Sequence, residues 1–264
     1  MKQQSSAALQ VVAPPQGLAR VQGNTIISVP HQHVMTDLCV EEGDTSGQSA
    51  AARKMFKVRL ANSDGHRTST SFLVQQRYAW RGYDVGVIPG IQPNRITLSA
   101  YDHDEAIATI SVGLDSVMGL FVDKLYGAEV DQIRASRLRK ICEFTKLAID
   151  GSVRSKTVLA ALFHIAYIYA RRINRCTDLL VEVNPRHVVF YKYMLGFSEW
   201  GPERLDARVR APAVLLRLKL AYAEGQIAKM GGRMELALKK RSLYPYFFSR
   251  HEESGIERRL RELG

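Results

Sequence analysis

The sequence predicts an α/β fold in which a mixed central sheet is flanked by helices and followed by a helical, basic C-terminal extension. Two observations lead to this prediction. Between residues 51 and 220, segments with the apolar pattern of strands alternate with segments whose apolar residues have helical spacing. The longest apolar helix, residues 157–172, lies between two strand-like segments, as in a right-handed crossover between parallel strands.

The elements of the first half follow from short-range patterns. Residues 1–50 are rich in Gln, Ser, Ala, Pro and Gly, so we expect a flexible extension. Polar and apolar residues alternate over 54–61, which indicates a strand. Apolar residues at helical spacing predict a helix over 70–83, and residues 95–101 and 105–114 predict a hairpin.

The second half contains three more strand patterns. Residues 119–137 have a mixed composition and predict no definite element. The strand patterns that follow cover residues 139–150, 177–183 and 208–220. Together with the helices between them, these strands predict a mixed sheet with helices on its faces.

Two helices connect these strands, and a third region follows them. Ser155 stands where it can cap the long helix, and the shorter helix, residues 186–195, ends at Gly196. From residue 221 the chain is basic and helical in pattern. We therefore divide the chain into a flexible extension (1–50), a domain that contains the predicted sheet (51–220) and a C-terminal extension (221–264) packed on or beside that domain.

The composition limits the environment and the partners of the protein. The 264 residues contain 37 Lys and Arg against 26 Asp and Glu, a net charge of +11. Such a balance attracts an acidic partner, which is nucleic acid, anionic lipid or an acidic protein. Three cysteines without a CxxC pair favour a reducing compartment, and no apolar run follows the N-terminal Met, so we expect a cytoplasmic protein.

One carboxylate stands in the middle of a strand. Residues 139–150 contain Glu143 between Cys142 and Phe144, although a strand buried on both faces is nearly all apolar. A buried carboxylate is costly unless it is paired or has a task. Glu143 is therefore either a catalytic group or a structural residue paired with a nearby arginine or lysine.

Two motifs resemble those of a known fold. The segment from Leu179 to Phe197 resembles the strand-then-helix end of the GNAT acyltransferases, with matching residues at Asn184, Tyr191 and Gly196-Phe197. The stretch Glu143-Phe-Thr-Lys-Leu-Ala148 is similar to a strand motif of the acyl-homoserine-lactone synthases, a GNAT branch fed by acyl carrier protein.

Over residues 54–220 the chain most resembles the long-chain N-acyl amino acid synthases of the same branch. The resemblance implies a GNAT-like fold and an N-acyltransferase. It would move a long-chain fatty acyl group from acyl carrier protein to the amine of an amino acid by direct thioester aminolysis. No tightly bound cofactor or metal is expected; His31-Gln-His33 lacks further ligands.

The loop before the long helix separates two kinds of acyl donor. Many GNAT enzymes hold the pyrophosphate of coenzyme A on a glycine-rich loop at this place. Residues 150–157 lack that glycine spacing, so acyl-CoA is less favoured than the phosphopantetheine arm of a carrier protein, which carries one phosphate. The residues expected to bind the donor arm are Thr145, Ser152, Arg154, Ser155, Lys156 and Asn184.

The resemblance implies roles for two catalytic residues. Glu143 would take a proton from the attacking amine or orient the amine through a water, because partial desolvation makes a carboxylate a better base. Backbone amides at the parted edge of its strand would stabilise the oxyanion. Tyr191 would protonate the leaving thiolate; the alternative is a core aromatic residue. Asn184 has the alternative of ending a strand and starting a helix.

Other basic residues are candidates for the acceptor and the carrier. Arg77 and Trp80, on the first helix, would hold the amino acid acceptor, unless Arg77 is a surface residue. The residues expected to dock an acidic carrier protein are Arg134, Arg137, Arg171 and Arg172. The alternative is a generally basic surface.

Three other functions remain open. The first is a lactone-type signal synthase, although only Asp84 stands where such enzymes carry an acidic pair. The second is a small-acyl GNAT enzyme that uses coenzyme A. The third is a non-catalytic protein that binds nucleic acid or a membrane surface, for which residues 244–250 offer an aromatic and basic segment and a route to peripheral membrane association. The pattern identifies neither the amino acid nor the acyl length.

Overall fold

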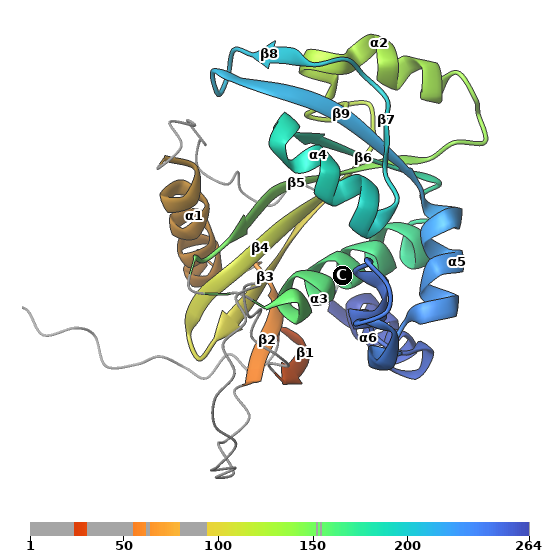
Figure 1. Cartoon of the computed structure of the whole chain (residues 1–264). Coiled ribbons are helices and arrows are strands. Elements are labelled where there is room, and N and C mark those ends of the chain that lie inside the picture. Colours follow the sequence, from red (N-terminus) through yellow and green to blue (C-terminus); the bar gives the residue numbers. More distant parts are fainter. Residues whose placement is uncertain are drawn as a thin grey trace, which may run out of the picture.

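The computed structural model describes residues 24–30, 55–61, 64–79, 94–151, 153 and 155–263. They form a nine-stranded sheet with helices on both faces (Figure 1). The strands are β1 (Thr25–Pro30), β2 (Met55–Leu60), β3 (Arg95–Asp102), β4 (Glu105–Leu114), β5 (Ile141–Ile149), β6 (Asp178–Val183), β7 (Ser198–Glu199), β8 (Arg204–Asp206) and β9 (Ala211–Lys219). The helices are α1 (Asp64–Ala79), α2 (Asp123–Arg134), α3 (Lys156–Tyr167), α4 (Pro185–Phe190), α5 (Leu220–Met230) and α6 (Arg250–Leu263).

The sheet is mixed, as predicted. Its strand order is β1-β2-β3-β4-β5-β6-β9-β7, with β8 paired to β9. The β5–β6 pair is parallel, and the other pairs are antiparallel. Helix α3 connects the two parallel strands and continues as a π-helical turn over Ile168–Ile173. The predicted crossover unit of strand, long helix and parallel strand is therefore confirmed.

Two elements lie where the sequence pattern indicated none. Strand β1 falls within residues 1–50 and pairs with β2, so part of the predicted flexible extension belongs to the sheet. Helix α2 occupies the stretch of mixed composition and buries Tyr126, Val130 and Ile133. These three residues have the i, i+4, i+7 spacing of an amphipathic helix, so a helical signal was present in the sequence although no helix was predicted.

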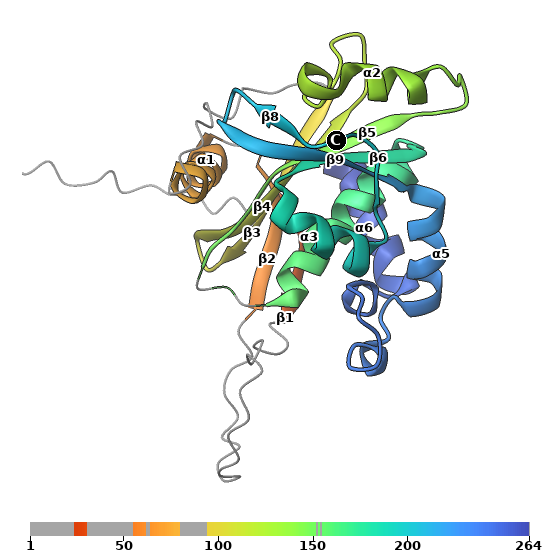
Figure 2. The same ribbon diagram turned by 45° about the horizontal axis from the view of Figure 1, so that its top comes forward.

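The two faces of the sheet differ in polarity. The largest apolar cluster joins the sheet to α3, with Leu98, Ile110, Leu162 and Ile165 all fully buried. Helices α1 and α2 cover the opposite face through two smaller clusters (Figure 2). Under α1 that face carries hydroxyl groups that bond to one another; the pairs are Thr70–Ser99, Ser99–Thr109 and Thr97–Ser111. The side of the sheet that faces α1 and α2 is therefore the polar side.

The C-terminal extension packs on the α3 side of the sheet. The Tyr244 hydroxyl donates to the Leu195 carbonyl at 2.7 Å, and Arg172 pairs with the buried Glu253 of α6 at 2.8 Å. The side chain of His164, on α3, lies against the rings of Phe247 and Phe248, with ring centroids 4.8 and 5.4 Å away. This extension thus contributes to the main core.

We expect His164 to make the fold sensitive to acid. The side chain is fully buried and its Nδ1 accepts a hydrogen bond from the Phe248 amide. Burial, and then the charge of Arg172, lowers its pKa from 6.5 to about 3. Below about pH 6.5, His164 becomes protonated in the unfolded chain, whereas it stays neutral in the native state. Stability should therefore fall by about 2 kcal/mol between pH 7 and pH 5 from this residue.

Urea unfolding at pH 7.5 and pH 5.0 measures this effect. A His164→Gln variant keeps an acceptor oxygen for the Phe248 amide but has no group that titrates in this range. The variant should lose about 2 kcal/mol less than the wild type between the two pH values. An equal loss in both proteins would contradict the prediction.

Candidate active site

Arg95 and Glu143 meet across three neighbouring strands. Arg95 of β3 is the register partner of Gly113 of β4, and Gly113 is the partner of Glu143 of β5. The Arg95 guanidinium crosses β4 at the glycine and donates from Nη2 to Glu143 Oε1 at 2.5 Å. A Cβ atom at position 113 would lie 2.6 Å from that nitrogen. The missing side chain of Gly113 therefore leaves the space in which the ion pair forms.

Arg95 also binds its surroundings through other atoms. Nη1 donates to Thr145 Oγ1 at 3.0 Å, and the guanidinium carbon lies 4.1 Å from the centre of the Phe121 ring. Its buried Nε has no hydrogen-bond partner among the described residues. Thr145 and Glu143 lie on the same face of β5, as the alternation of a strand requires. Arg95 thus organises this side of the site, although its residue pattern in the sequence did not predict this role.

Glu143 is fully buried and holds three hydrogen bonds. Besides Arg95, the amides of Phe121 and Val122 donate to its two carboxylate oxygens at 2.9 and 3.1 Å. These amides belong to the turn that leads into α2, so Glu143 also anchors that helix. Both carboxylate oxygens of Glu143 are thus engaged by donors within the protein. Glu143 is therefore the paired carboxylate that was the structural alternative to a catalytic group.

Strands β5 and β6 part next to Glu143. They pair only from Ile141 to Glu143 on β5 and from Asp178 to Leu180 on β6. Beyond these residues each strand remains paired on its other side, to β4 and β9 respectively. The facing backbone groups of the parted segments are therefore directed into the space between the strands.

A bulge in β5 accompanies the parting. Thr109 and Ser111 of β4 pair with Ala148 and Thr145, so β5 has one more residue than β4 over this stretch. Lys146 lies in the bulge with a left-handed φ of 53°. Burial, and then the charge of Arg95, lowers the pKa of its ammonium. The bulge bends β5 at the position where its pairing with β6 has ended.

Glu182 faces this region from β6. Leu180 is the register partner of Glu143, and Glu182 follows two residues later, so both carboxylates lie on the α2 side of the sheet. The Arg208 Nη2 donates to Glu182 at 3.0 and 3.2 Å and to Asp206 at 2.7 Å. The two carboxylates thus share one guanidinium at the β6 side of the parted strands.

The two carboxylates that share Arg208 differ in acidity. Burial raises the pKa of Glu182 to about 7; Arg208 opposes this rise, and the neighbouring Asp206 carboxyl adds to it. Burial also acts to raise the pKa of Asp206, but hydrogen bonds from Arg208 outweigh it and lower that pKa below its ordinary value. Two carboxyl groups whose pKa values are pushed apart are a common arrangement for acid–base work. A polar residue inside the apolar Leu179–Val183 run was the available signal for Glu182.

Tyr191 lies on the other side of the sheet. It is buried in a π-helical turn, Tyr191–Leu195, that follows α4. Its ring makes edge contacts with Phe163, Phe190 and Phe197 at centroid distances of 6.1, 5.4 and 5.3 Å. Phe163 in turn contacts Phe144 of β5, which points away from the face of Glu143. We call Arg95, Glu143 and Glu182 the polar centre and the rings around Tyr191 the aromatic cluster. The parted strands therefore lie between the aromatic cluster on one face of the sheet and the polar centre on the other.

Asn184 has the structural role that was its alternative. It precedes Pro185 and caps α4, with its Oδ1 accepting from the Arg186 amide at 3.3 Å. Its Nδ2 donates to the Pro212 carbonyl at 3.3 Å. Both polar ends of the side chain are thus engaged, and a role in binding the donor arm stays a prediction.

The residues expected to bind a phosphate lie at the start of α3. Ser155 occupies the N-cap position but its side chain makes no capping hydrogen bond, contrary to expectation. Its buried Oγ has no partner among the described residues. The Lys156 ammonium lies 5.8 Å from the centre of the Tyr246 ring. Ser152 and Arg154 fall outside the described residues.

Three of the four arginines expected to dock a carrier are neutralised within the chain. Arg134 binds Asp115, Asp123 and Asp131, which raises its pKa. Arg171 pairs with Glu224, and Arg172 pairs with Glu224 and Glu253. Arg137 is exposed. The basic run along the sequence is therefore not a patch of free charge, because its acidic partners come from elements distant in sequence.

The acceptor candidates lie at the edge of the described structure. Arg77 is part of α1, the helix that covers the polar face of the sheet, and its side chain is not described. Trp80 lies outside the described residues. Within the described part of the chain, no group of three or more His, Cys, Asp or Glu side chains is arranged to hold a metal ion. None of the described helices has the length and apolar character needed to span a membrane.

A model of the family described as N-acyl amino acid synthase FeeM matches residues 69–219, more than half of the chain. The chain belongs to this family. The FeeM match extends from α1 to the end of β9 and includes Arg95, Glu143, Glu182 and Tyr191. This FeeM-family protein is therefore an N-acyl amino acid synthase with the fold of the GNAT acyltransferases, as the resemblance predicted.

The structure of FeeM agrees with the fold of this FeeM-family synthase, and two other solved structures are similar to a lower degree. FeeM from uncultured soil microbes is similar at 24% identity and a TM-score of 0.58, covering 64% of this chain and 93% of that one. ElaA from Escherichia coli has 9% identity and a TM-score of 0.46, covering 62% and 99%. The synthase LasI has 17% identity and a TM-score of 0.44, covering 62% and 90%. No curated protein matches the sequence significantly.

Proposed function

We propose that the protein moves a long-chain fatty acyl group from acyl carrier protein to the amine of an amino acid by direct thioester aminolysis. The observation that supports this most is the parting of β5 and β6 between a polar centre and an aromatic cluster. A thioester carbonyl between the strands can meet backbone amides, carboxylates on one side and Tyr191 on the other. Direct transfer needs no acyl-enzyme intermediate.

The reaction is written as one addition and one elimination. The nitrogen lone pair of the amine forms the C–N bond, and the carbonyl oxygen gains a negative charge that backbone amides at the parted edge stabilise. The oxyanion then forms the C=O bond again as the C–S bond breaks, and the electron pair of the C–S bond leaves with the sulfur of the pantetheine arm. The Tyr191 hydroxyl gives the thiolate a proton, and the proton lost by the amine passes to a carboxylate.

The contacts separate the roles of the two carboxylates. Glu143 accepts three hydrogen bonds that engage both of its carboxylate oxygens, so we assign it the task of fixing Arg95 and the start of α2. Glu182 has a pKa raised to about 7. It lies on the same face of the sheet as Glu143, beyond Leu180, the last residue of β6 that pairs with β5. A base with a pKa near the working pH transfers protons efficiently. We therefore place the proton acceptor at Glu182, and Glu143 as the base becomes the alternative.

A carrier-bound donor fits the start of α3 better than coenzyme A. The loop at 150–157 lacks the glycine spacing that suits a pyrophosphate, whereas one phosphate needs few donors. The buried Ser155 Oγ without a partner and the nearby Lys156 ammonium are the described groups that support this assignment. The net charge of +11 favours encounter with an acidic carrier protein.

The acceptor would approach from the α1 side. Arg77 and Trp80 come from that helix or directly follow it, and we propose that Arg77 binds the acceptor carboxylate in a bidentate pair. The polar face of hydroxyls beneath α1 agrees with a polar acceptor rather than a fatty chain on this side. The acyl chain would then lie on the apolar α3 side.

Mass spectrometry of lipid extracts from cells that express the protein tests this function. We expect N-acyl amino acids that are absent from cells expressing a Glu182→Gln variant. Purified protein should then transfer the acyl group faster from acyl carrier protein than from acyl-CoA. Lactones in the extract would instead indicate a signal synthase, preference for acyl-CoA would overturn the donor assignment, and no new lipid would contradict the proposal.

A further inference from the structure

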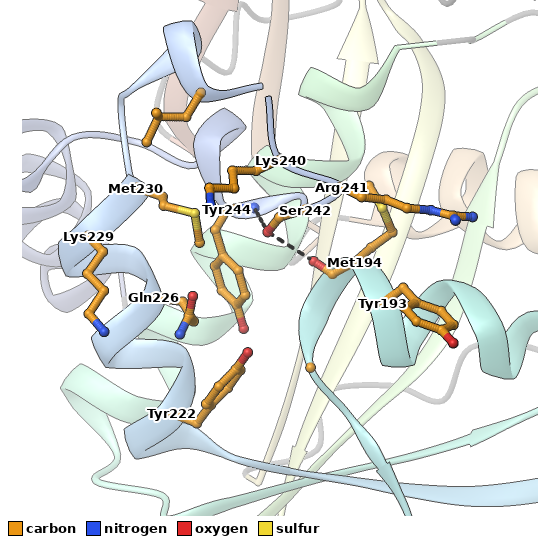
Figure 3. A pocket seen from close by; sticks show the side chains of 12 residues that line it. Tyr193, Met194, Tyr222, Gln226, Lys229, Met230, Lys240, Arg241, Ser242 and Tyr244 are labelled. Carbon is orange, nitrogen blue, oxygen red and sulfur yellow. Dashed lines mark hydrogen bonds between the residues drawn. The ribbon is translucent and has the colours of Figure 1, made fainter. Parts of the chain in front are cut away.

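A pocket of about 460 Å³ lies outside the proposed active site. It is formed by the end of the Tyr191–Leu195 turn, by α5, and by the segment from residue 236 to 244 (Figure 3). Most of its lining follows residue 219, where the match to the synthase family ends. The pocket therefore belongs mainly to the C-terminal extension.

The polar rim of the pocket carries only positive charge. Lys229, Lys240 and Arg241 line it, and no aspartate or glutamate does. All three side chains are exposed, and among the described residues none of them forms an ion pair. Arg241 lies 5.5 Å from the centre of the Tyr193 ring. These charges differ from Arg134, Arg171 and Arg172, whose carboxylate partners neutralise them.

One wall of the pocket is apolar and anchored. Met194, Met230 and Tyr244 line it, and the Tyr244 hydroxyl donates to the Leu195 carbonyl at 2.7 Å. Ser242 accepts from the Tyr244 amide and donates to the Met194 carbonyl, as Figure 3 shows. Methionine side chains adapt their shape to flexible apolar ligands. The pocket thus combines a fixed apolar wall with an open cationic rim.

We propose that this pocket binds an anionic amphiphile, with a carboxylate or phosphate head against Lys229, Lys240 and Arg241 and an aliphatic chain against Met194 and Met230. Its volume lies in the range of sites that take small molecules. The three cations have no carboxylate partner among the described residues and can attract an anion, and the methionine side chains offer apolar surface to a chain. A fatty acid, an acylated amino acid and an anionic lipid all have this chemistry, and none of them requires the acyl-transfer reaction.

Calorimetric titration of the full-length protein with monomeric amphiphiles of equal chain length tests the site. The probes are dodecanoate, dodecyl phosphate, dodecyltrimethylammonium and dodecyl maltoside. We expect the two anions to bind and the cation and the neutral probe to bind at least about tenfold more weakly. In the variant Lys229→Gln/Lys240→Gln/Arg241→Gln the anions should lose at least about tenfold in affinity.

A variant with the same change of charge elsewhere is the matched control. Lys57→Gln/Arg175→Gln/Arg258→Gln replaces three exposed cations on β2, before β6 and on α6, and should bind the anions as the wild type does. Equal loss in both variants, or equal binding of the cationic probe, would overturn the proposal. Since all six positions are exposed, both variants should unfold at the temperature of the wild type.

Vesicles distinguish the sources of the anion. If phosphatidylglycerol vesicles and monomeric anions both lose binding in the pocket variant, the ligand is a membrane lipid; if only the monomers do, it is a free amphiphile. Binding of vesicles without binding of monomers would show that the exposed cations attract an anionic surface only, and it would overturn the proposal that the pocket binds an amphiphile. Loss of acyl carrier protein binding in the pocket variant, with amphiphile binding unchanged, would assign the rim to carrier docking instead.

Discussion

Replacing Glu182 with glutamine is expected to lower kcat/KM for aminolysis by about 10²-fold or more, because a positioned general base contributes about 10² to 10⁴. Only the deprotonated carboxylate can accept the proton of the amine. With a pKa of about 7, wild-type activity should fall as the pH drops through this value. In the variant this fall of activity at low pH, the acidic limb of the pH–rate profile, should be absent. Rates measured with acyl carrier protein as donor from pH 5.5 to 9 check both expectations.

Two further variants locate the base. Arg208 lowers the pKa of Glu182, so Arg208→Gln should move the limb to higher pH while activity remains at alkaline pH. Glu143→Gln should reduce activity but keep the limb if Glu143 only positions its neighbours. If the limb disappears in Glu143→Gln and persists in Glu182→Gln, Glu143 is the base, as the sequence first suggested.

Replacing Arg95 with leucine is expected to lower the free energy of unfolding by about 3 kcal/mol or more. The side chain of its partner Glu143 is fully buried, and a buried charge that loses its partner costs about 3–5 kcal/mol. The amides of Phe121 and Val122 remain and offset part of this cost. Urea unfolding at pH 7.5 measures the loss.

A double variant and an exposed pair provide the controls. Arg95→Leu/Glu143→Leu removes both charges and should recover part of the loss, since no unpaired charge stays buried. Arg233→Leu breaks an ion pair with Glu235 in which both side chains are more than half exposed, and it should leave the free energy of unfolding nearly unchanged. A similar small effect of Arg95→Leu would show that the Arg95–Glu143 pair does not hold the site together.

The two carboxylates of the candidate site could be predicted, because each is a charged residue within an otherwise apolar strand. A carboxylate inside an apolar strand marked Glu143, and the same signal marks Glu182 in β6. Arg95 carries no such signal, since an arginine at the start of a strand is ordinary. Its importance comes from the registers of two strand pairs, which place Gly113 between it and Glu143. The sequence does not report these registers.

The charged residues show the same limit more strongly. Arg134, Arg171 and Arg172 are close in sequence to the expected donor entrance, but their partners lie on other elements; Asp115 precedes α2, and Glu224 and Glu253 lie on α5 and α6. A count of charges predicted the attraction to acidic partners. It did not predict which charges remain free, because neutralisation depends on contacts between segments far apart in the chain.

The sequence by itself determined the α/β class, the crossover from β5 through α3 to β6, and the kinship with N-acyl amino acid synthases. Periodicity and short motifs are local properties, so they can be recognised without knowing which distant residues are in contact. The tertiary structure decided that Glu143 is held by Arg95, that Glu182 lies beyond the parting of β5 and β6, and that the C-terminal extension forms a cationic pocket. Each of these depends on burial or on strand register, which arise only when distant segments pack together.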